Sequence, residues 1–498
     1  MGRFVSIAVA LAAAGFSSIA LGQHAGHTAA DIPAAPVQRD AYARGLNLLH
    51  NFEYDSAAQA FRAEQQADPG NVMAFWGEAM TFNHPLWAYQ DASAARAVLL
   101  RLGPSPAARR AKARTSREAM WLDAVDALYG QGDKVARDYA YHDRMRVLFE
   151  ADPDDIDART FYALSTLGLA HQGRDTALYM KAAALLEEAF PRHPDHPGLL
   201  HYMIHSYDDP DHAPLGERAA ARYAEVAPHA GHAQHMISHI YLALGRWAAV
   251  EAANIQAMKV VNAQRAGAAR PPTYCGHYSE WLIYALDQQG KESTSSIGRC
   301  RTEAIATLQS GQDRTVLGGD RNLFNNWATI AVRHGVDTGQ WPDWSSIPTE
   351  GSVAAGRFDL AYGRLLASRR DPAGAAAALA ELIGLRERML AVMPTERPDD
   401  HESAPWLDRA VAQGEAVVAL ASGRQEQGLR KLRAAAQAES ALPKPFGPPI
   451  LAKPAWELLG DELLAAGDKA GAAAAYRESL KLQPGRRLSL AGLAKATS

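Results

Sequence analysis

The chain has 498 residues, a formal net charge of −4 and an apolar fraction of 48%. A chain of this length exceeds what one compact core supports, so we expect several domains or a solenoid. The near-neutral charge leaves no basic surface for nucleic acid, and the sequence has no phosphate-binding glycine loop and no GxSxG nucleophile motif.

The first 22 residues predict a secretory signal peptide. Arg3 precedes an uncharged run from Phe4 to Leu21, and Ala20 and Gly22 are the small residues of a cleavage site. No other uncharged stretch approaches the roughly 18 residues that span a bilayer. We therefore expect a periplasmic or secreted protein with no membrane span after cleavage, an uncleaved anchor being the alternative. Residues 23–37 lack periodicity and predict a flexible leader.

Helical hairpins are predicted from Gln38 onwards, because alanine-rich sequence with few β-branched runs favours helices. The first hairpin has Gly45, Ala57, Phe61 and Pro69 at regular positions. The last hairpin repeats this pattern more completely, with Trp456, Leu459, Gly460, Ala472, Tyr476 and Pro484. The small residues let two helices approach, the aromatic residue fills the space between hairpins, and the proline ends the second helix.

With this pattern the chain resembles the tetratricopeptide-repeat family, and within it a group of exported bacterial repeat proteins. The resemblance implies an all-α, tetratricopeptide-type solenoid of helical hairpins, wound into a right-handed superhelix. It also implies that the first helix of each pair lines a concave groove. We place this solenoid at residues 38–338, a linker at 339–352 and further C-terminal repeats at 353–498. A proline-rich stretch from Ser440 to Lys453 predicts a stiff extended loop among those repeats.

Cys275 and Cys300 are the only cysteines in the sequence. Their separation of 25 residues would place them across one helical hairpin, and cysteines of an exported protein can oxidise. A disulfide and a pair of buried, small apolar side chains both remain open interpretations.

Histidines are concentrated in one part of the chain, where nine of the eighteen fall between His193 and His239. His201 and His205 are followed 34 residues later by His235 and His239. Thirty-four residues is the length of one tetratricopeptide unit, and residues four apart lie on the same helix face. The spacing therefore predicts that two stacked helices carry imidazoles at equivalent positions, side by side.

Imidazoles on neighbouring parallel helices can reach one metal ion at about 2.0–2.1 Å, and nearby carboxylates can add to such a site. The candidate metal ligands are His201, His205, His235, His239, His277, Glu280 and Asp208. Other polar residues on the predicted groove face are candidates for binding a ligand or partner: His50, His84, His171, Asp209, His232, Tyr284, Asn322 and Asn325. These donor types suit Zn, Cu or Fe without selecting one of them.

Three functions are compatible with these residues. The first is binding of a transition metal in the groove for storage, delivery or metal-dependent chemistry. The second is a metal-free scaffold that captures an envelope protein or a peptide in the groove. The third is a metal-independent enzyme that uses histidine as a general base. The sequence assigns no catalytic residue, and structural packing of the histidines is the competing interpretation.

Overall fold

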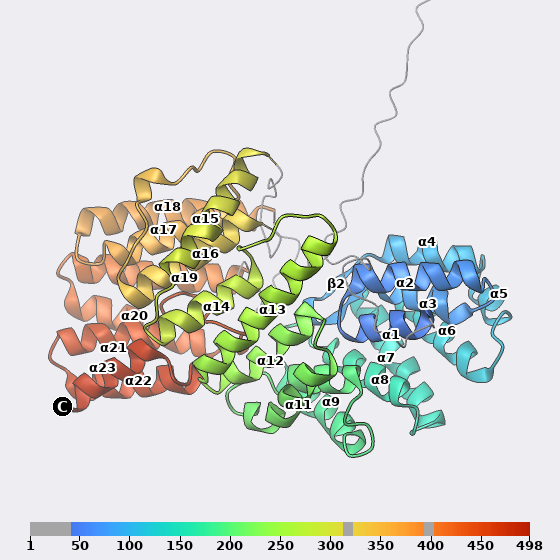
Figure 1. The fold of residues 1–498 in the computed structure, drawn as a ribbon. Helices are drawn as coiled ribbons and strands as arrows, with labels where there is room; N and C mark the ends of the chain where they lie inside the picture. The colour runs from blue at the N-terminus through green and yellow to red at the C-terminus, as the bar shows by residue number, and fades with distance from the viewer. Residues whose placement is uncertain (1–40, 312–321, 393–402) are drawn as a thin grey trace, which may run out of the picture.

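The computed structural model describes residues 41–311, 322–392 and 403–498. The predicted signal peptide and leader lie outside these residues. The described residues form helices joined by short turns, and their only strands are the antiparallel pair β1 (Asn83–His84) and β2 (Tyr89–Gln90). None of the helices in the described ranges is long and apolar enough to cross a membrane. The predicted all-α solenoid of helical hairpins is confirmed (Figure 1).

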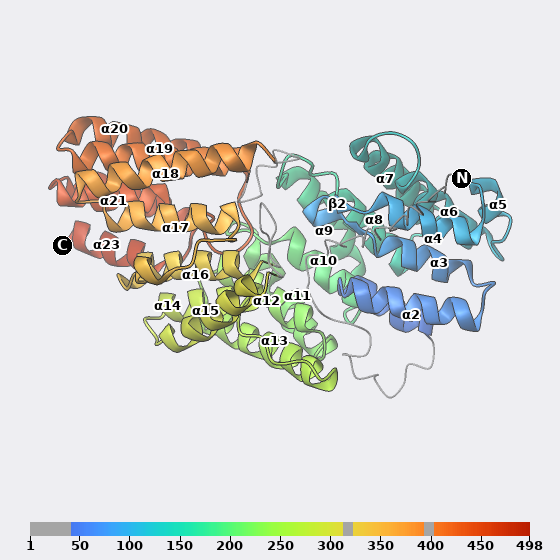
Figure 2. The same cartoon turned by 90° about the horizontal axis from the view of Figure 1, so that it is seen from above.

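The helices follow one another in antiparallel pairs along the chain. The first half contains α1 (Ala41–His50), α2 (Tyr54–Ala67), α3 (Val72–Met80), the 3-10 helix η2 (Pro85–Trp87), α4 (Ala92–Leu102), α5 (Pro106–Arg110), α6 (Ser116–Leu128), α7 (Lys134–Ala151), α8 (Ile156–Leu167), α9 (Thr176–Ala189), α10 (Pro197–Ser206), α11 (Ala213–Val226), α12 (Gly231–Ala243) and α13 (Trp247–Gly267). The second half contains α14 (His277–Gln288), α15 (Thr294–Gln309), α16 (Leu323–Thr338), the 3-10 helix η3 (Trp344–Ser346), α17 (Ala354–Ala367), α18 (Pro372–Leu390), α19 (Ala404–Ala421), α20 (Gln425–Ser440), α21 (Ala455–Ala465), α22 (Lys469–Leu482) and α23 (Arg487–Thr497). Figure 2 shows α2–α8 at one end, α17–α23 at the other and α9–α13 in the middle, with α14–α16 alongside α17.

Close approach between hairpins depends on glycines that face an aromatic ring. A Cβ atom added at Gly45 would lie 2.8 Å from the Phe61 ring, and one added at Gly77 would lie 2.4 Å from it. Tyr476 occupies the equivalent position in the last hairpin, where Cβ atoms at Gly460 and Gly492 would lie 2.7 and 2.2 Å from its ring. One aromatic ring therefore packs against its own hairpin and the next, as the sequence pattern predicts.

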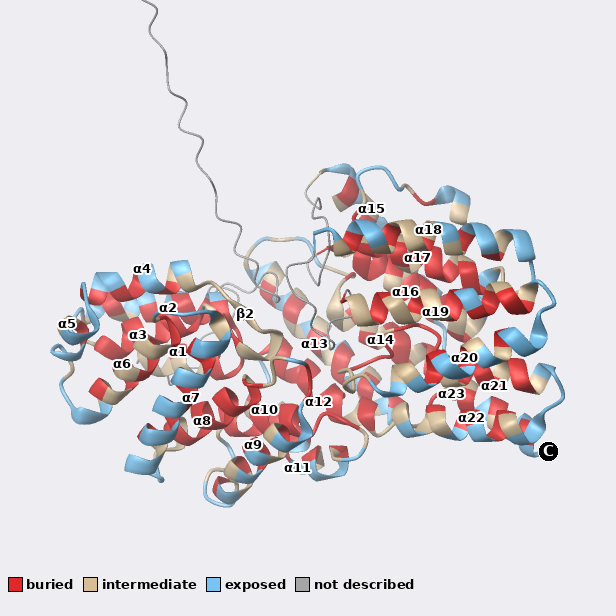
Figure 3. Cartoon of the chain, turned by 180° about the vertical axis from the view of Figure 1, so that it is seen from behind, coloured by how far each residue is buried: buried red, intermediate tan, exposed pale blue. Residues whose placement is uncertain are grey.

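Two large apolar cores fill the solenoid, and buried residues line the faces by which neighbouring helices meet (Figure 3). The first core runs from α1 to α13, and the second begins at Cys275 and continues to α23. A smaller cluster that includes Trp247 and Trp281 lies between them. Helices α16 and α17 pack directly against each other, although residues 339–352, the predicted linker, separate them in the sequence. A disulfide joins Cys275 to Cys300 within the second core.

The proline-rich segment between α20 and α21 crosses from the second half of the solenoid to the first. Lys444 pairs with Asp211, and the Phe446 ring lies 6.3 Å from that of Tyr179. Gly447 has a φ of +83°, a conformation that favours glycine. These contacts hold an extended loop across the middle of the molecule.

The stability of the second half is expected to depend on the protonation of Glu439 at the end of α20. Its carboxylate accepts hydrogen bonds from the Ala455 backbone and from Gln413, at 3.2 and 3.1 Å. Burial nevertheless raises the pKa of Glu439 from 4.5 to about 7. The folded protein thus holds this proton more tightly than the unfolded chain, so the stabilisation is fully present below about pH 4.5 and is lost as the pH rises through about 7.

Thermal unfolding measured from pH 5 to 8 checks this expectation. Glu439→Gln should flatten the decline in stability by an amount on the order of 1 kcal/mol, because the residue is only partly buried. Glu426→Gln on the same helix is the control, since Glu426 is exposed. Parallel profiles for the wild type and Glu439→Gln would contradict the prediction.

Candidate metal centre

Three helices in the middle of the chain bring six histidines together. Helix α10 carries His201 and His205, four residues apart and therefore on one face. Helix α12 contributes His232, His235 and His239, whose spacing of three and four residues also describes a single face. The sixth, His277, is the first residue of α14. The face of α12 is thus shared by two groups of imidazoles.

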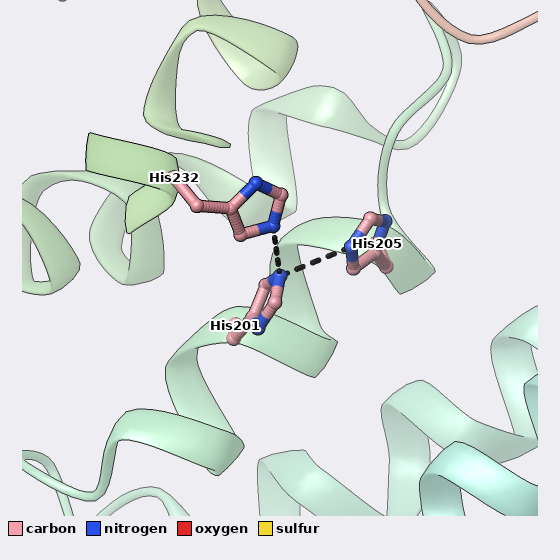
Figure 4. A group of neighbouring side chains, drawn as sticks. All are labelled: His201, His205 and His232. Atoms are coloured by element: carbon pink, nitrogen blue, oxygen red, sulfur yellow. Dashed lines mark hydrogen bonds between the residues drawn. The ribbon is translucent and has the colours of Figure 1, made fainter. Parts of the chain in front are cut away.

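The first triad consists of His201, His205 and His232 (Figure 4). The Nε2 atom of His201 lies 3.1 Å from Nε2 of His205 and 3.2 Å from Nε2 of His232. All three side chains are buried. Three ring nitrogens therefore converge on one point in the interior of the protein.

The second triad consists of His235, His239 and His277. Nε2 of His235 lies 3.2 Å from Nε2 of His239, and ring nitrogens of all three residues lie within 4.8 Å of one another. His235 and His239 are buried, whereas His277 is partly exposed. This triad adjoins the first, since the rings of His205 and His239 are 6.1 Å apart.

Hydrogen bonds at the Nδ1 atoms of His235 and His239 fix the orientation of these two rings. Nδ1 of His239 donates to Asp208 at 2.6 Å, and Nδ1 of His235 donates to Oδ1 of Asn254 at 2.7 Å. The Asn254 amide is oriented by its own bond to the Val250 carbonyl oxygen. With Nδ1 protonated, each neutral ring presents a lone pair at Nε2. The Nε2 atoms of the two rings therefore face each other across 3.2 Å, an orientation in which one metal ion can be bound by both.

His201 is held in the same way in the first triad. Its Nδ1 donates to the backbone carbonyl oxygen of His50 at 2.6 Å, so its Nε2 lone pair points toward the other two rings. Burial lowers the pKa of His201 to about 3, because an imidazolium in this interior would lose its hydration. The ring is therefore neutral at physiological pH, the state in which imidazole coordinates a metal.

In each triad, one aromatic ring contacts all three imidazoles. Phe52 contacts the three rings of the first triad, at centroid distances of 4.4, 5.9 and 5.9 Å. Trp281 contacts the three rings of the second triad, at 4.7, 4.4 and 5.7 Å. Phe52 adopts a φ of +57°, which is unusual for a residue with a side chain and is found where surrounding structure imposes it. The triads thus lie inside the helix stack and do not line an open groove.

Two predicted metal ligands have other partners in the structure. Asp208 accepts a hydrogen bond from Nδ1 of His239 and is not one of the three residues whose ligand atoms converge in the second triad. Glu280 forms an ion pair with Arg333 of α16. His232, which the sequence places on the groove face, instead completes the first triad.

His50 belongs to a third polar group, beside the first triad. Its Nε2 and that of His196 each lie 3.2 Å from Asp157, and its Nδ1 lies 3.0 Å from the Tyr202 hydroxyl. Burial opposes ionisation of Asp157, but the hydrogen bonds from His196 and His50 outweigh it and lower the pKa of this carboxyl. These groups satisfy one another as donors and acceptors without a metal ion.

The remaining groove candidates are distributed over the molecule, and each has a partner of its own. His84 stacks on Tyr54, His171 bonds to Asp138, Asp209 pairs with Arg174, Tyr284 bonds to Arg486, and Asn322 caps α16 through the backbone of Asn325. They do not form a continuous lining around the triads.

Comparison with known proteins leaves function open. No family model matches the chain, and no curated protein matches its sequence. Similar solved structures include the APC/C hetero-tetramer Cut9–Hcn1, with 12% identity, a TM-score of 0.35 and coverage of 92% of this chain and 76% of that one. Yeast Tom70 has 13% identity, a TM-score of 0.31 and coverage of 92% and 94%. The TPR domain of P58(IPK) has 11% identity, a TM-score of 0.23 and coverage of 92% and 96%. These scores are too low for the likeness to bear on function.

Proposed function

We propose that this chain is an exported helical-repeat protein that binds a transition metal at its histidine triads. The observation that carries the proposal is the pair of Nε2 atoms of His235 and His239, 3.2 Å apart, while the Nδ1 atoms of both rings are bonded to oxygen acceptors. A metal ion accepts both lone pairs at once.

The donor set indicates which metals fit. Neutral imidazoles suit Cu, Zn, Fe or Ni, and hard cations such as Mg²⁺ prefer oxygen ligands. Asp208 orients His239 from behind and places one negative charge near the ion, as carboxylates do in many histidine sites. Three protein ligands leave a coordination position open to water or a small molecule. Storage, delivery and metal-dependent chemistry are all consistent with such a site.

Export is part of the proposal, and it rests on the uncharged run after Arg3 and the small residues that end it. A metal-free interaction scaffold of the cell envelope is the competing function, because helical-repeat solenoids bind peptides and proteins on extended surfaces. The two functions differ in whether the purified protein retains metal.

Elemental analysis of protein purified without an affinity tag tests the proposal. We expect at least one equivalent of a transition metal per chain to remain after dialysis against a weak chelator. Chelator-stripped protein should recover that content when supplied with Zn, Cu or Fe salts. Metal below about a tenth of an equivalent, both as purified and after reloading, would favour the scaffold.

A further inference from the structure

We infer that the two triads form one dinuclear centre, in which two metal ions, each held by three imidazoles, share a bridging oxygen ligand. This inference rests on the proposed function, because it requires that the triads bind metal. It adds the number of ions, their proximity and the class of ligand between them.

The first argument is the continuity of the six histidines. Ring centroids within the triads are 4.6–5.1 Å apart for neighbouring pairs. Between the triads, the His205–His239 and His232–His235 separations are 6.1 and 6.5 Å, only slightly larger. Helix α12 explains this proximity, since His232 belongs to one triad and His235 to the other, about one turn along the same helix.

The second argument is the position of the aromatic rings. Phe52 covers the first triad and Trp281 covers the second, and each ring contacts all three imidazoles of its triad. Each ion would therefore be closed off on one side by an aromatic ring. An oxygen atom at the fourth coordination position of one ion would reach the second ion as well if it lay between the two triads, whose nearest rings are 6.1 Å apart.

The third argument is electrostatic. Two divalent cations at the spacing of about 3.5–4 Å that is usual in two-metal sites repel each other strongly in a buried environment. Neutral imidazoles do not reduce this repulsion, and Asp208 contributes a single negative charge through His239. An anionic bridge such as hydroxide is the ligand that balances the pair. Because five of the six histidines are buried, the bridging ligand must be small.

Copper(II) titration with electron paramagnetic resonance tests the inference. His24 and His27, which lie outside the described residues, are replaced by alanine in every sample so that copper bound near the N-terminus does not contribute. We expect chelator-stripped protein to bind two copper ions per chain. The integrated signal should account for less than half of the bound copper, because a shared bridge couples the two spins.

Variants of one triad at a time provide the decisive comparison. His239→Ala with His277→Ala should leave one copper ion per chain with its full signal, and so should His205→Ala with His232→Ala in the other triad. Using both variants keeps the comparison valid if one of them fails to fold. His229→Ala removes an exposed histidine of the same segment and should behave as the wild type.

The outcomes separate this inference from the proposed function. Two copper ions with the signal of two independent spins, or a single ion per chain in the wild type, would overturn the dinuclear centre while leaving metal binding intact. Failure of the wild type to retain any copper, zinc or iron would overturn both.

Discussion

Replacing His205 and His239 together by alanine is expected to abolish metal retention and leave the helical fold largely intact. Each substitution removes one of three ligands from a triad, so we expect affinity to fall by roughly 100-fold or more. Both side chains lie where the two triads adjoin, and 5% and 7% of their surface is exposed. Metal content by elemental analysis and helix content by circular dichroism are the measurements.

His229→Ala is the matched control for the double variant, because it removes an exposed histidine between the two ligand-bearing helices. Metal content in this control should be unchanged. A double variant that keeps its metal would show that the triads are not the site. A double variant that unfolds would show that these histidines serve mainly to pack the core.

The helical hairpins could be predicted because their determinants are local and repeated. Gly45 with Phe61, and Gly460 with Tyr476, recur at the same separation and pack as the spacing requires. The histidine pairs follow the same logic, since four residues along a helix and one repeat along the solenoid both bring side chains together. Periodicity was therefore sufficient to place His201, His205, His235 and His239 in one region.

The rest of the site depends on contacts that periodicity does not encode. Phe52 follows the end of α1, and Asn254 lies on the second helix of its hairpin, so neither falls on the predicted groove face. Glu280 had the right register for a ligand, but Arg333, more than fifty residues later, takes it as an ion-pair partner. The groove itself is closed by α1, which packs on α10, and by Trp281, against which Gly447 of the proline-rich segment lies. Such long-range packing leaves no signal in a single sequence.

Arg486→Met is expected to destabilise the protein by about 3–5 kcal/mol, because it removes one partner from a buried network of charges. Arg486 lies between α22 and α23 and is fully buried. Its guanidinium is 2.8 Å from Glu457 and 2.8 Å from Asp337 of α16, and it also donates to the Tyr284 hydroxyl of α14 at 3.1 Å. The arginine lowers the pKa of Glu457 to about 2 against the opposing effect of burial. Without it, both carboxylates would remain buried, and Lys453 would be left as the cation that pairs with Glu457.

Thermal or denaturant unfolding, followed at the first transition, measures this effect. Arg430→Met is the control, because that residue pairs with Glu426 on the exposed face of α20 and should change stability by less than about 0.5 kcal/mol. Adding Asp337→Asn and Glu457→Gln to Arg486→Met should recover much of the loss, since Lys453 keeps its pair with Asp461 and the unpaired carboxylates are gone. If Arg486→Met alone unfolds like the wild type, the network does not join the C-terminal hairpins to the centre of the solenoid. The hydrogen bond from Trp247 to the Gly485 backbone, 2.9 Å long, would then be the contact that joins them.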